Sequence, residues 1–297
     1  LYVANDGDAN QLWLNVPEQT RFVDDAPLAG VAYSMQGAPQ AGMGVDAGDI
    51  DDDGDDDLVV AHLSGEANAL YVNQGEGLFE DRAIAWSLQA SSLPVTSFGA
   101  HFLDGDLDGD LDLAVVNGAV RLQHDLMRRE GADPLLQTNQ LFENDGGEFR
   151  EITDQSGPDW ASLNVGRGLA VGDVDNDGDH DLLITSNGGP ARLLLGTASE
   201  HRHWIGLTLC DRAGHAGVTQ ALVRIEQPPD RILQRRSHTD GSYLSASDPR
   251  VLVGLGEMDA PCRVAVTWPN GASEAWEGLA ADRYHDLQEG TGTVVTR

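Results

Sequence analysis

Aspartates recur at alternate positions in three short segments of this chain, residues 49–57, 104–112 and 173–181. Each segment fits the pattern D-x-D-x-D-G-x-x-D followed by leucine. Carboxylates at this spacing, with a glycine at position six that lets the chain turn sharply, can surround a hard cation with oxygen ligands. Ca²⁺ prefers such an oxygen-only ligand set. The alternative is that these segments are solvated acidic turns, but the same spacing occurs unchanged in all three. The sequence therefore predicts about three calcium sites.

The residues after these loops exclude an EF-hand. An EF-hand has a bidentate glutamate at position twelve and flanking helices. Position twelve is instead Val60, Val115 or Ile184, and each of these residues lies in a short apolar run typical of a strand. We therefore expect the aspartate at position nine to close each cage, and the residue at position seven to offer its backbone carbonyl.

Composition limits the classes of partner. The chain has 297 residues, a formal charge of −31 and no lysine. Three calcium ions would offset six charges and leave about −25, which argues against nucleic acid or an anionic membrane as partners. No apolar run approaches the length of a membrane span, and no common catalytic motif is present. Cys210 and Cys262 leave two alternatives open, a disulfide or two separate buried thiols.

The loops belong to a longer repeat. Each is followed by an apolar strand, and strands of the form N-x-L-x-x-N recur at residues 10–15, 68–73 and 139–144. Loop starts are 55 residues (49 to 104) and 69 residues (104 to 173) apart, and the longer interval contains an insertion of short helical character at residues 118–138. About four short strands per unit predict an all-β fold made of β-propeller blades.

The domain boundary is expected near residue 196, where the acidic loops stop. Residues 1–196 would form about three and a half blades, and the first residues match a strand that follows an acidic loop. We therefore expect a propeller segment truncated at its N-terminus. Residues 197–297 alternate apolar strands with glycine and proline turns, which predicts a second, small all-β domain.

The acidic loops, with Ser97-Phe98-Gly99-Ala100 before the second, resemble the FG-GAP/VCBS repeats of integrin α-subunit propellers and many bacterial exported proteins. The other two units depart from this element, with Met43-Gly44 and Arg167-Gly168. The resemblance implies structural Ca²⁺ in a bacterial, exported protein. Carried over residue by residue, it implies as metal ligands Asp49, Asp51, Asp53, Asp55, Asp57, Asp104, Asp106, Asp108, Asp110, Asp112, Asp173, Asp175, Asp177, Asp179 and Asp181.

The C-terminal hundred residues resemble the ASPIC/UnbV domain of the cartilage acidic protein family. The match is carried by residues 240–245 (DGSYLS), 248–250 (DPR), 254–256 (GLG) and 268–271 (WPNG). The sequence departs from the family at residues 211–217 (DRAGHAG). A propeller of these repeats followed by this domain is the usual arrangement of that family.

Three functions remain open at this point. The chain is either a calcium-stabilised extracellular or periplasmic module for binding an unknown protein or glycan, an enzyme of secondary metabolism, or a spacer in a longer surface protein. An enzyme would need a deep pocket at the axial mouth of the propeller or at the domain junction. No residue is predicted to be catalytic, and the oligomeric state is left open. His201 and His203 are expected in a surface linker, and Arg235-Arg236 is expected to dock against the acidic propeller.

Overall fold

The computed structural model describes the chain except for residues 17–19, 122–132, 228–230 and 296–297. Most of the predicted helical insertion therefore lies outside the described residues. The regular structure is almost entirely β strand, which confirms the all-β prediction. The short helices are α1 (Ala26–Ala29), α2 (Leu88–Ser92), η3 (Thr153–Gln155) and η4 (Ala198–Glu200). None of the described helices is long and apolar enough to cross a membrane.

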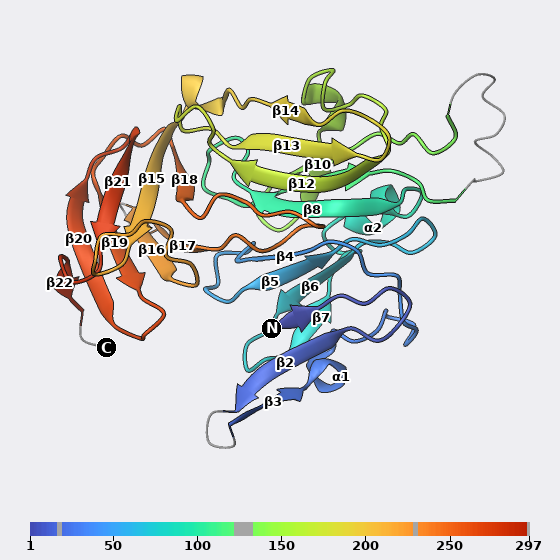
Figure 1. Cartoon of the computed structure of the whole chain (residues 1–297), viewed down its shortest axis with the longest axis horizontal. Coiled ribbons are helices and arrows are strands. Elements are labelled where there is room, and N and C mark those ends of the chain that lie inside the picture. The colour runs from blue at the N-terminus through green and yellow to red at the C-terminus, as the bar shows by residue number, and fades with distance from the viewer. Residues whose placement is uncertain (17–19, 122–132, 228–230, 296–297) are drawn as a thin grey trace.

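The first two thirds of the chain form four antiparallel sheets in which neighbouring strands follow chain order. Figure 1 shows these sheets stacked one on another, as blades are stacked in a propeller. The first two sheets contain β1 (Tyr2–Val3), β2 (Gln11–Val16) and β3 (Arg21–Asp24), then β4 (Val45–Gly48), β5 (Asp57–Val60), β6 (Ala69–Asn73) and β7 (Phe79–Asp81). The next two contain β8 (Ser97–Leu103), β9 (Asp112–Asn117), β10 (Gln140–Asn144) and β11 (Phe149–Glu151), then β12 (Gly166–Gly172), β13 (Asp181–Ser186) and β14 (Arg192–Leu194).

Apolar side chains fill the spaces between the blades. One buried cluster joins the first two blades through residues such as Leu12 and Tyr71. A second, with Trp86 and Phe142, joins the second and third blades, and a third around Leu169 and Ile184 joins the third and fourth. The central strands β5 and β9 are buried along their whole length. These β-branched and leucine-rich runs are buried on both faces, as the stacking of blades requires.

The last third of the chain, here called the C-terminal module (residues 203–294), forms two further sheets. One contains β15 (His203–Cys210), β18 (Val251–Gly256) and β21 (Arg283–Gln288). The other contains β16 (Leu222–Gln227), β17 (Arg231–Arg236), β19 (Cys262–Thr267), β20 (Ser273–Leu279) and β22 (Thr293–Val294). A single apolar core fills the space between them. Cys210 and Cys262 are both buried free thiols, which decides between the two alternatives for the cysteines.

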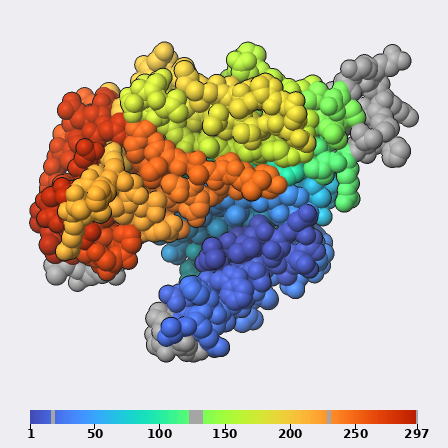
Figure 2. Space-filling view, in the orientation of Figure 1, coloured from blue at the N-terminus to red at the C-terminus, as the bar shows by residue number. Residues whose placement is uncertain are grey.

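The segment between β17 and β18 leaves the module and lies against the blades. The Ser242 amide donates to the Val45 carbonyl at 2.8 Å, and the Asp248 amide donates to the Val171 carbonyl at 2.9 Å. This segment therefore touches the second and the fourth blade. Figures 1 and 2 show it in orange, running from the module between the blue and yellow blades.

Candidate metal centre

Each acidic loop joins the first two strands of a blade: β4 to β5, β8 to β9 and β12 to β13. The three loops share one backbone conformation. The glycine at position six has φ of +95°, +96° and +93° in Gly54, Gly109 and Gly178. Position four is also left-handed in all three. Only glycine adopts a φ near +95° without strain, which explains why this position is glycine each time.

Hydrogen bonds inside the loops turn the carboxylates at position one inward. Asp49 accepts from the amides of Asp53 and Gly54, both at 3.0 Å. Asp104 and Asp173 make the equivalent bond to the glycine at position six, at 3.1 and 2.9 Å. The aspartate at position five accepts from the amide at position seven in every loop, at 2.9 to 3.0 Å. The backbone of each loop therefore aligns its own acidic side chains.

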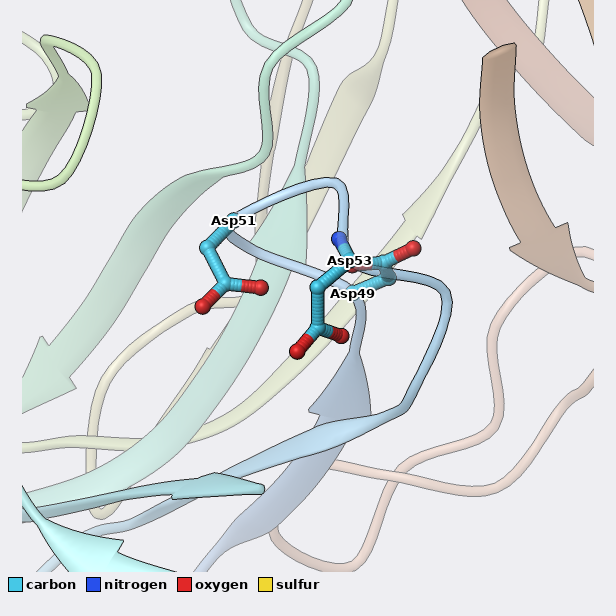
Figure 3. Close-up of side chains that lie close together, drawn as sticks. All are labelled: Asp49, Asp51 and Asp53. Carbon is cyan, nitrogen blue, oxygen red and sulfur yellow. The ribbon is translucent and has the colours of Figure 1, made fainter. Parts of the chain in front are cut away.

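The aligned side chains form three acidic clusters. In each, the oxygens offered by three carboxylates lie within 4.8 Å of one another. Figure 3 shows the first cluster gathered in the turn after β4. The clusters contain Asp49, Asp51 and Asp53, then Asp104, Asp106 and Asp108, then Asp173, Asp175 and Asp181.

Six predicted ligands are not members of these clusters: Asp55, Asp57, Asp110, Asp112, Asp177 and Asp179. At position nine, Asp57 accepts from the amides of Ile50 and Asn73, and Asp112 from those of Gly105 and Asn144. Asp181 makes the same pair of bonds and also belongs to its cluster. At position seven, Asp55 is exposed, Asp110 pairs with Arg231, and Asp179 accepts two bonds from Ser199. Asp177 lies outside the third cluster. The predicted carbonyl ligand at position seven stays a prediction.

One atom of the second cluster makes the case for a cation. Asp104 is 1% exposed, and its Oδ1 has no hydrogen-bond donor in the described structure. A buried carboxylate oxygen without a partner is costly, because it has lost water without replacement. The ligand set is oxygen only and dianionic or more, which fits Ca²⁺ better than a transition metal. In each loop, the aspartates that would hold an ion are the members of that loop's cluster.

Burial raises the pKa values of several loop carboxylates. Burial, opposed by nearby arginine and amides, raises the pKa of Asp104 to about 7. Burial likewise raises the pKa of Asp112 to about 8 and that of Asp57 to about 7. The pKa of Asp49 rises to about 6 through burial and repulsion from Asp52. A bound cation would reverse these shifts by stabilising the ionised form.

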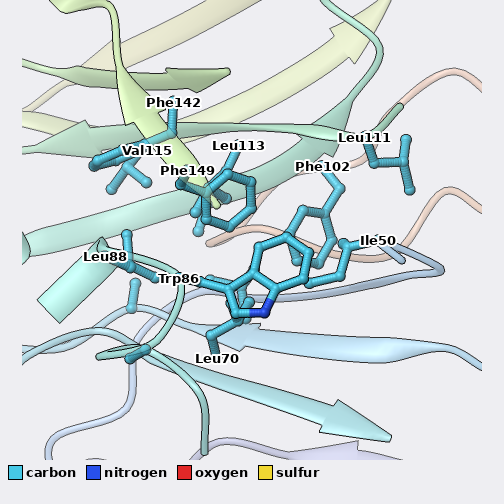
Figure 4. Packing of buried hydrophobic residues seen from close by; sticks show 14 of the residues in the cluster. Ile50, Leu70, Trp86, Leu88, Phe102, Leu111, Leu113, Val115, Phe142 and Phe149 are labelled. Carbon is cyan, nitrogen blue, oxygen red and sulfur yellow. The ribbon is translucent and has the colours of Figure 1, made fainter. Parts of the chain in front are cut away.

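Apolar residues within the loops anchor them to the core. Ile50 follows the first aspartate of the first loop, Leu111 precedes the last aspartate of the second, and both pack with Trp86 and Phe102 (Figure 4). The side chain of Asn144 donates to the carbonyls of Ile50 and Leu111, at 2.9 and 3.2 Å. The last asparagine of the N-x-L-x-x-N strand thus links two neighbouring loops, a role that the sequence analysis did not assign.

All three loops contact the C-terminal module. Arg231 bonds to Asp108 and Asp110 of the second loop and Asp52 of the first. The Arg235 guanidinium donates to the Gly109 carbonyl, and Arg236 pairs with Asp56. The expectation that Arg235-Arg236 docks on the acidic propeller is therefore confirmed.

Apolar contacts at the loops were not expected from the sequence. Leu107, at position four of the second loop, is fully buried against Trp204 and Leu252 of the module. The Gly256 amide donates to the Leu107 carbonyl at 2.9 Å. Trp204 also lies on Gly178 of the third loop. In the sequence, the leucine itself could have indicated this contact, since the first and third loops carry polar residues, Asp52 and Asn176, at position four.

A cavity of about 90 Å³, lined by both charged and apolar side chains, lies at the junction between blades and module. Its wall includes His101, which is buried and paired with Asp46 at 3.0 Å. Arg235, whose Nε has no partner in the described structure, also lines it. Ligand pockets usually occupy ~300–1,000 Å³, so this cavity suits waters or a small ion better than a large substrate. His201 and His203 lie outside all three acidic clusters, and His203 pairs with Asp282 at 2.8 Å.

Comparison with known proteins agrees with this architecture. The profile of the FG-GAP-like repeat matches residues 49–115 and 128–184, and that of the ASPIC and UnbV family matches residues 214–294. The chain therefore contains FG-GAP-like repeats followed by a C-terminal ASPIC/UnbV domain.

The relatives found by sequence are named cartilage acidic protein 1. Those of Mus musculus, Homo sapiens and Xenopus tropicalis are each 26% identical to this chain over 277 residues. The match covers 91% of this chain but only 39–40% of each relative. The chain thus spans about two fifths of the length of these vertebrate proteins, and they give no support to the expected bacterial origin.

Proposed function

We propose that this chain is a calcium-stabilised binding or scaffold module of an extracellular protein. One observation carries the metal assignment: Asp104 Oδ1 is buried without a donor, inside a cluster of carboxylates that the loop itself aligns. A divalent cation supplies the missing partner and relieves the repulsion between neighbouring aspartates. The same backbone conformation in all three loops extends the assignment to three sites.

The FG-GAP-like repeats and the similarity to cartilage acidic protein 1 support the extracellular role. Extracellular calcium modules bind the ion with a Kd of ~10⁻⁴–10⁻³ M, which matches sites that fill only where calcium is abundant. The strong negative charge of the chain favours a protein or glycan partner over nucleic acid. A junction cavity of about 90 Å³ does not carry a proposal of catalysis.

In this role each ion ties the turn between two strands of one blade. Because the cages do not exist in the unfolded chain, the free energy of calcium binding adds to that of folding. At a calcium concentration 100 times Kd, each site contributes about 2.7 kcal/mol.

Thermal unfolding in calcium and in EDTA tests the proposal. We expect Tm to rise with Ca²⁺ from zero to ~10 mM, more than with Mg²⁺, and native mass spectrometry to count three ions. Asp106→Ala should lower Tm in calcium and leave it nearly unchanged in EDTA, because Asp106 acts through the ion. Asp145→Ala, an exposed aspartate outside the loops, is the matched control. Equal losses of Tm for Asp106→Ala in both conditions contradict the proposal.

A further inference from the structure

The three loops differ in what holds the carboxylate at position one. In the second loop, the Gly254 amide of β18 donates to Asp104 Oδ2 at 2.7 Å. In the third, the Tyr284 hydroxyl of β21 donates to Asp173 Oδ2, also at 2.7 Å. Among the described hydrogen bonds, Asp49 of the first loop accepts only from amides of its own loop.

Both donors from the module are held firmly in place. A Cβ on Gly254 would lie 2.2 Å from the backbone of Leu107, so only glycine lets β18 approach the second loop this closely. The ring of Tyr284 packs edge-on against Trp204 at 5.3 Å and beneath the Arg250 guanidinium at 4.4 Å. Neither donor can leave its carboxylate without moving the interface.

The second oxygen, Oδ1, differs between the two carboxylates: in Asp173 it accepts from the amides of Asn176 and Asp177 of its own loop. Asp104 directs Oδ2 to two amides, while its Oδ1 has no donor. A hydrogen bond to the second oxygen fixes the orientation of a metal-binding carboxylate, and loss of such a partner typically costs 10–100-fold in metal affinity. In the first loop, no such partner of Asp49 occurs among the described residues of the module.

We propose that the C-terminal module completes the second and third calcium sites through Gly254 and Tyr284, so that calcium binding there and docking of the module strengthen each other. The first site binds calcium independently of these donors. The inference rests on the proposed calcium function and adds a specific coupling to it. Coupling of this kind is reciprocal: whatever the module adds to calcium affinity, calcium adds to docking.

Calorimetric titration of the calcium-free full chain with Ca²⁺ tests the first half of the inference. Tyr284→Phe removes one hydroxyl and keeps the ring. We expect the Kd of one of three sites to rise by roughly 10-fold or more, with the other two unchanged. Tyr243→Phe is the matched control, since its ring packs on Phe98 in the same interface at 4.9 Å, away from the loops. It should bind three ions with the affinities of the wild type.

A double-mutant cycle assigns the affected site. Asp175→Ala disables the third loop, and adding Tyr284→Phe to it should cause no further loss of calcium affinity. An additional loss overturns the assignment of Tyr284 to the third loop. Three unchanged sites in Tyr284→Phe, or an equal loss at all three, overturn the inference but leave the calcium function standing. If the wild-type chain binds no calcium, the proposed function itself fails.

Hydrogen exchange tests the docking half. In the wild type, calcium should slow amide exchange in peptides from β18 and β21 relative to EDTA. Asp104→Ala should abolish the calcium effect in β18, whereas Asp49→Ala should preserve it. Identical exchange of both strands with and without calcium in the wild type overturns the coupling.

Discussion

The first and second acidic loops follow the same sequence pattern but differ in their surroundings. In the first, Asp51 and Asp53 are exposed, and polar groups such as Gln234 and Arg231 provide the contacts with the module. In the second, Leu107 is fully buried in the module, and Gly254 bonds to Asp104. A pattern that folds each loop in the same way thus places one acidic cluster near the surface and another inside a domain interface.

The difference shows that local sequence sets the shape of the cage, while tertiary contacts set how strongly it is coupled to the rest of the protein. Left-handed residues at positions four and six recur in all three loops. Among the described hydrogen bonds, the donors from β18 and β21 reach the second and third loops but not the first. The predictions below separate what the loops share from what distinguishes them.

The largest effect concerns what the loops share, which is buried acidity. The pKa values of Asp57 and Asp104 are raised to about 7 and that of Asp112 to about 8. A raised carboxyl pKa contributes stability that is fully present below the unfolded value near 4 and is lost as pH rises through the folded value. The metal-free protein should therefore gain stability on acidification from pH 8 to pH 5, with Tm rising by roughly 10 °C.

Calcium should reverse this slope. Bound calcium keeps the carboxylates ionised, so acidification of the loaded protein releases the ion and lowers Tm. Scanning calorimetry at pH 5, 6.5 and 8, in EDTA and in saturating calcium, gives both slopes. Asp57→Asn and Asp112→Asn should each flatten the metal-free slope, because each removes one titrating group from one loop. A Tm that falls on acidification in EDTA contradicts the prediction.

A second prediction compares the same glycine in two loops. Gly54 and Gly178 have almost the same positive φ, so alanine strains the backbone equally, by about 1–2 kcal/mol. Around Gly54 the nearest atom to a new Cβ is the Arg224 guanidinium at 3.6 Å, whereas at Gly178 it would lie 1.9 Å from the Trp204 ring. We expect Gly54→Ala to cost about 1.5 kcal/mol and Gly178→Ala about 4 kcal/mol, because overpacking adds about 1–3 kcal/mol.

Urea unfolding of both variants in saturating calcium measures this difference. Equal losses of free energy would mean that Trp204 moves away from the third loop without cost. The expected difference between the first and third loops would then be wrong.

The sequence predicted the parts of this protein that depend on neighbours in the chain. Three loops with alternating carboxylates, the strands after them and the all-β fold follow from spacing and periodicity over ten to sixty residues. The donors to Asp104 and Asp173 lie 150 and 111 residues away in the chain, so no local pattern relates them. Gly254 was recognised only as part of a family motif, and the structure gives it a physical role.

The arrangement of side chains within the loops also has a local and a long-range cause. The turn that brings the aspartates together follows from the glycine at position six. The pairing of Asp110 with Arg231 and of Asp179 with Ser199 depends on where the module and η4 lie. Leu107 stands out in the sequence as an apolar residue among charged ones. Its partner Trp204 is identified only in the folded structure.

The smallest of these effects tests the apolar contact at position four. Leu107→Ala removes a side chain that is fully buried between the second loop and the module, and a cavity of this kind costs about 3 kcal/mol.

Asp52→Ala is the matched change in the first loop. Asp52 pairs with Arg231 at 3.3 Å in a partly exposed position, and such pairs contribute about 0.2–1 kcal/mol. Both residues have left-handed backbone, with φ of +59° for Leu107 and +57° for Asp52, so both alanines would be placed in the same backbone conformation. Unfolding free energies in EDTA should show the same difference of about 2 kcal/mol or more as in calcium, because Leu107 holds the module by packing rather than through the ion. A Leu107→Ala loss that vanishes in EDTA would instead mean that the module docks on the second loop only when calcium is bound.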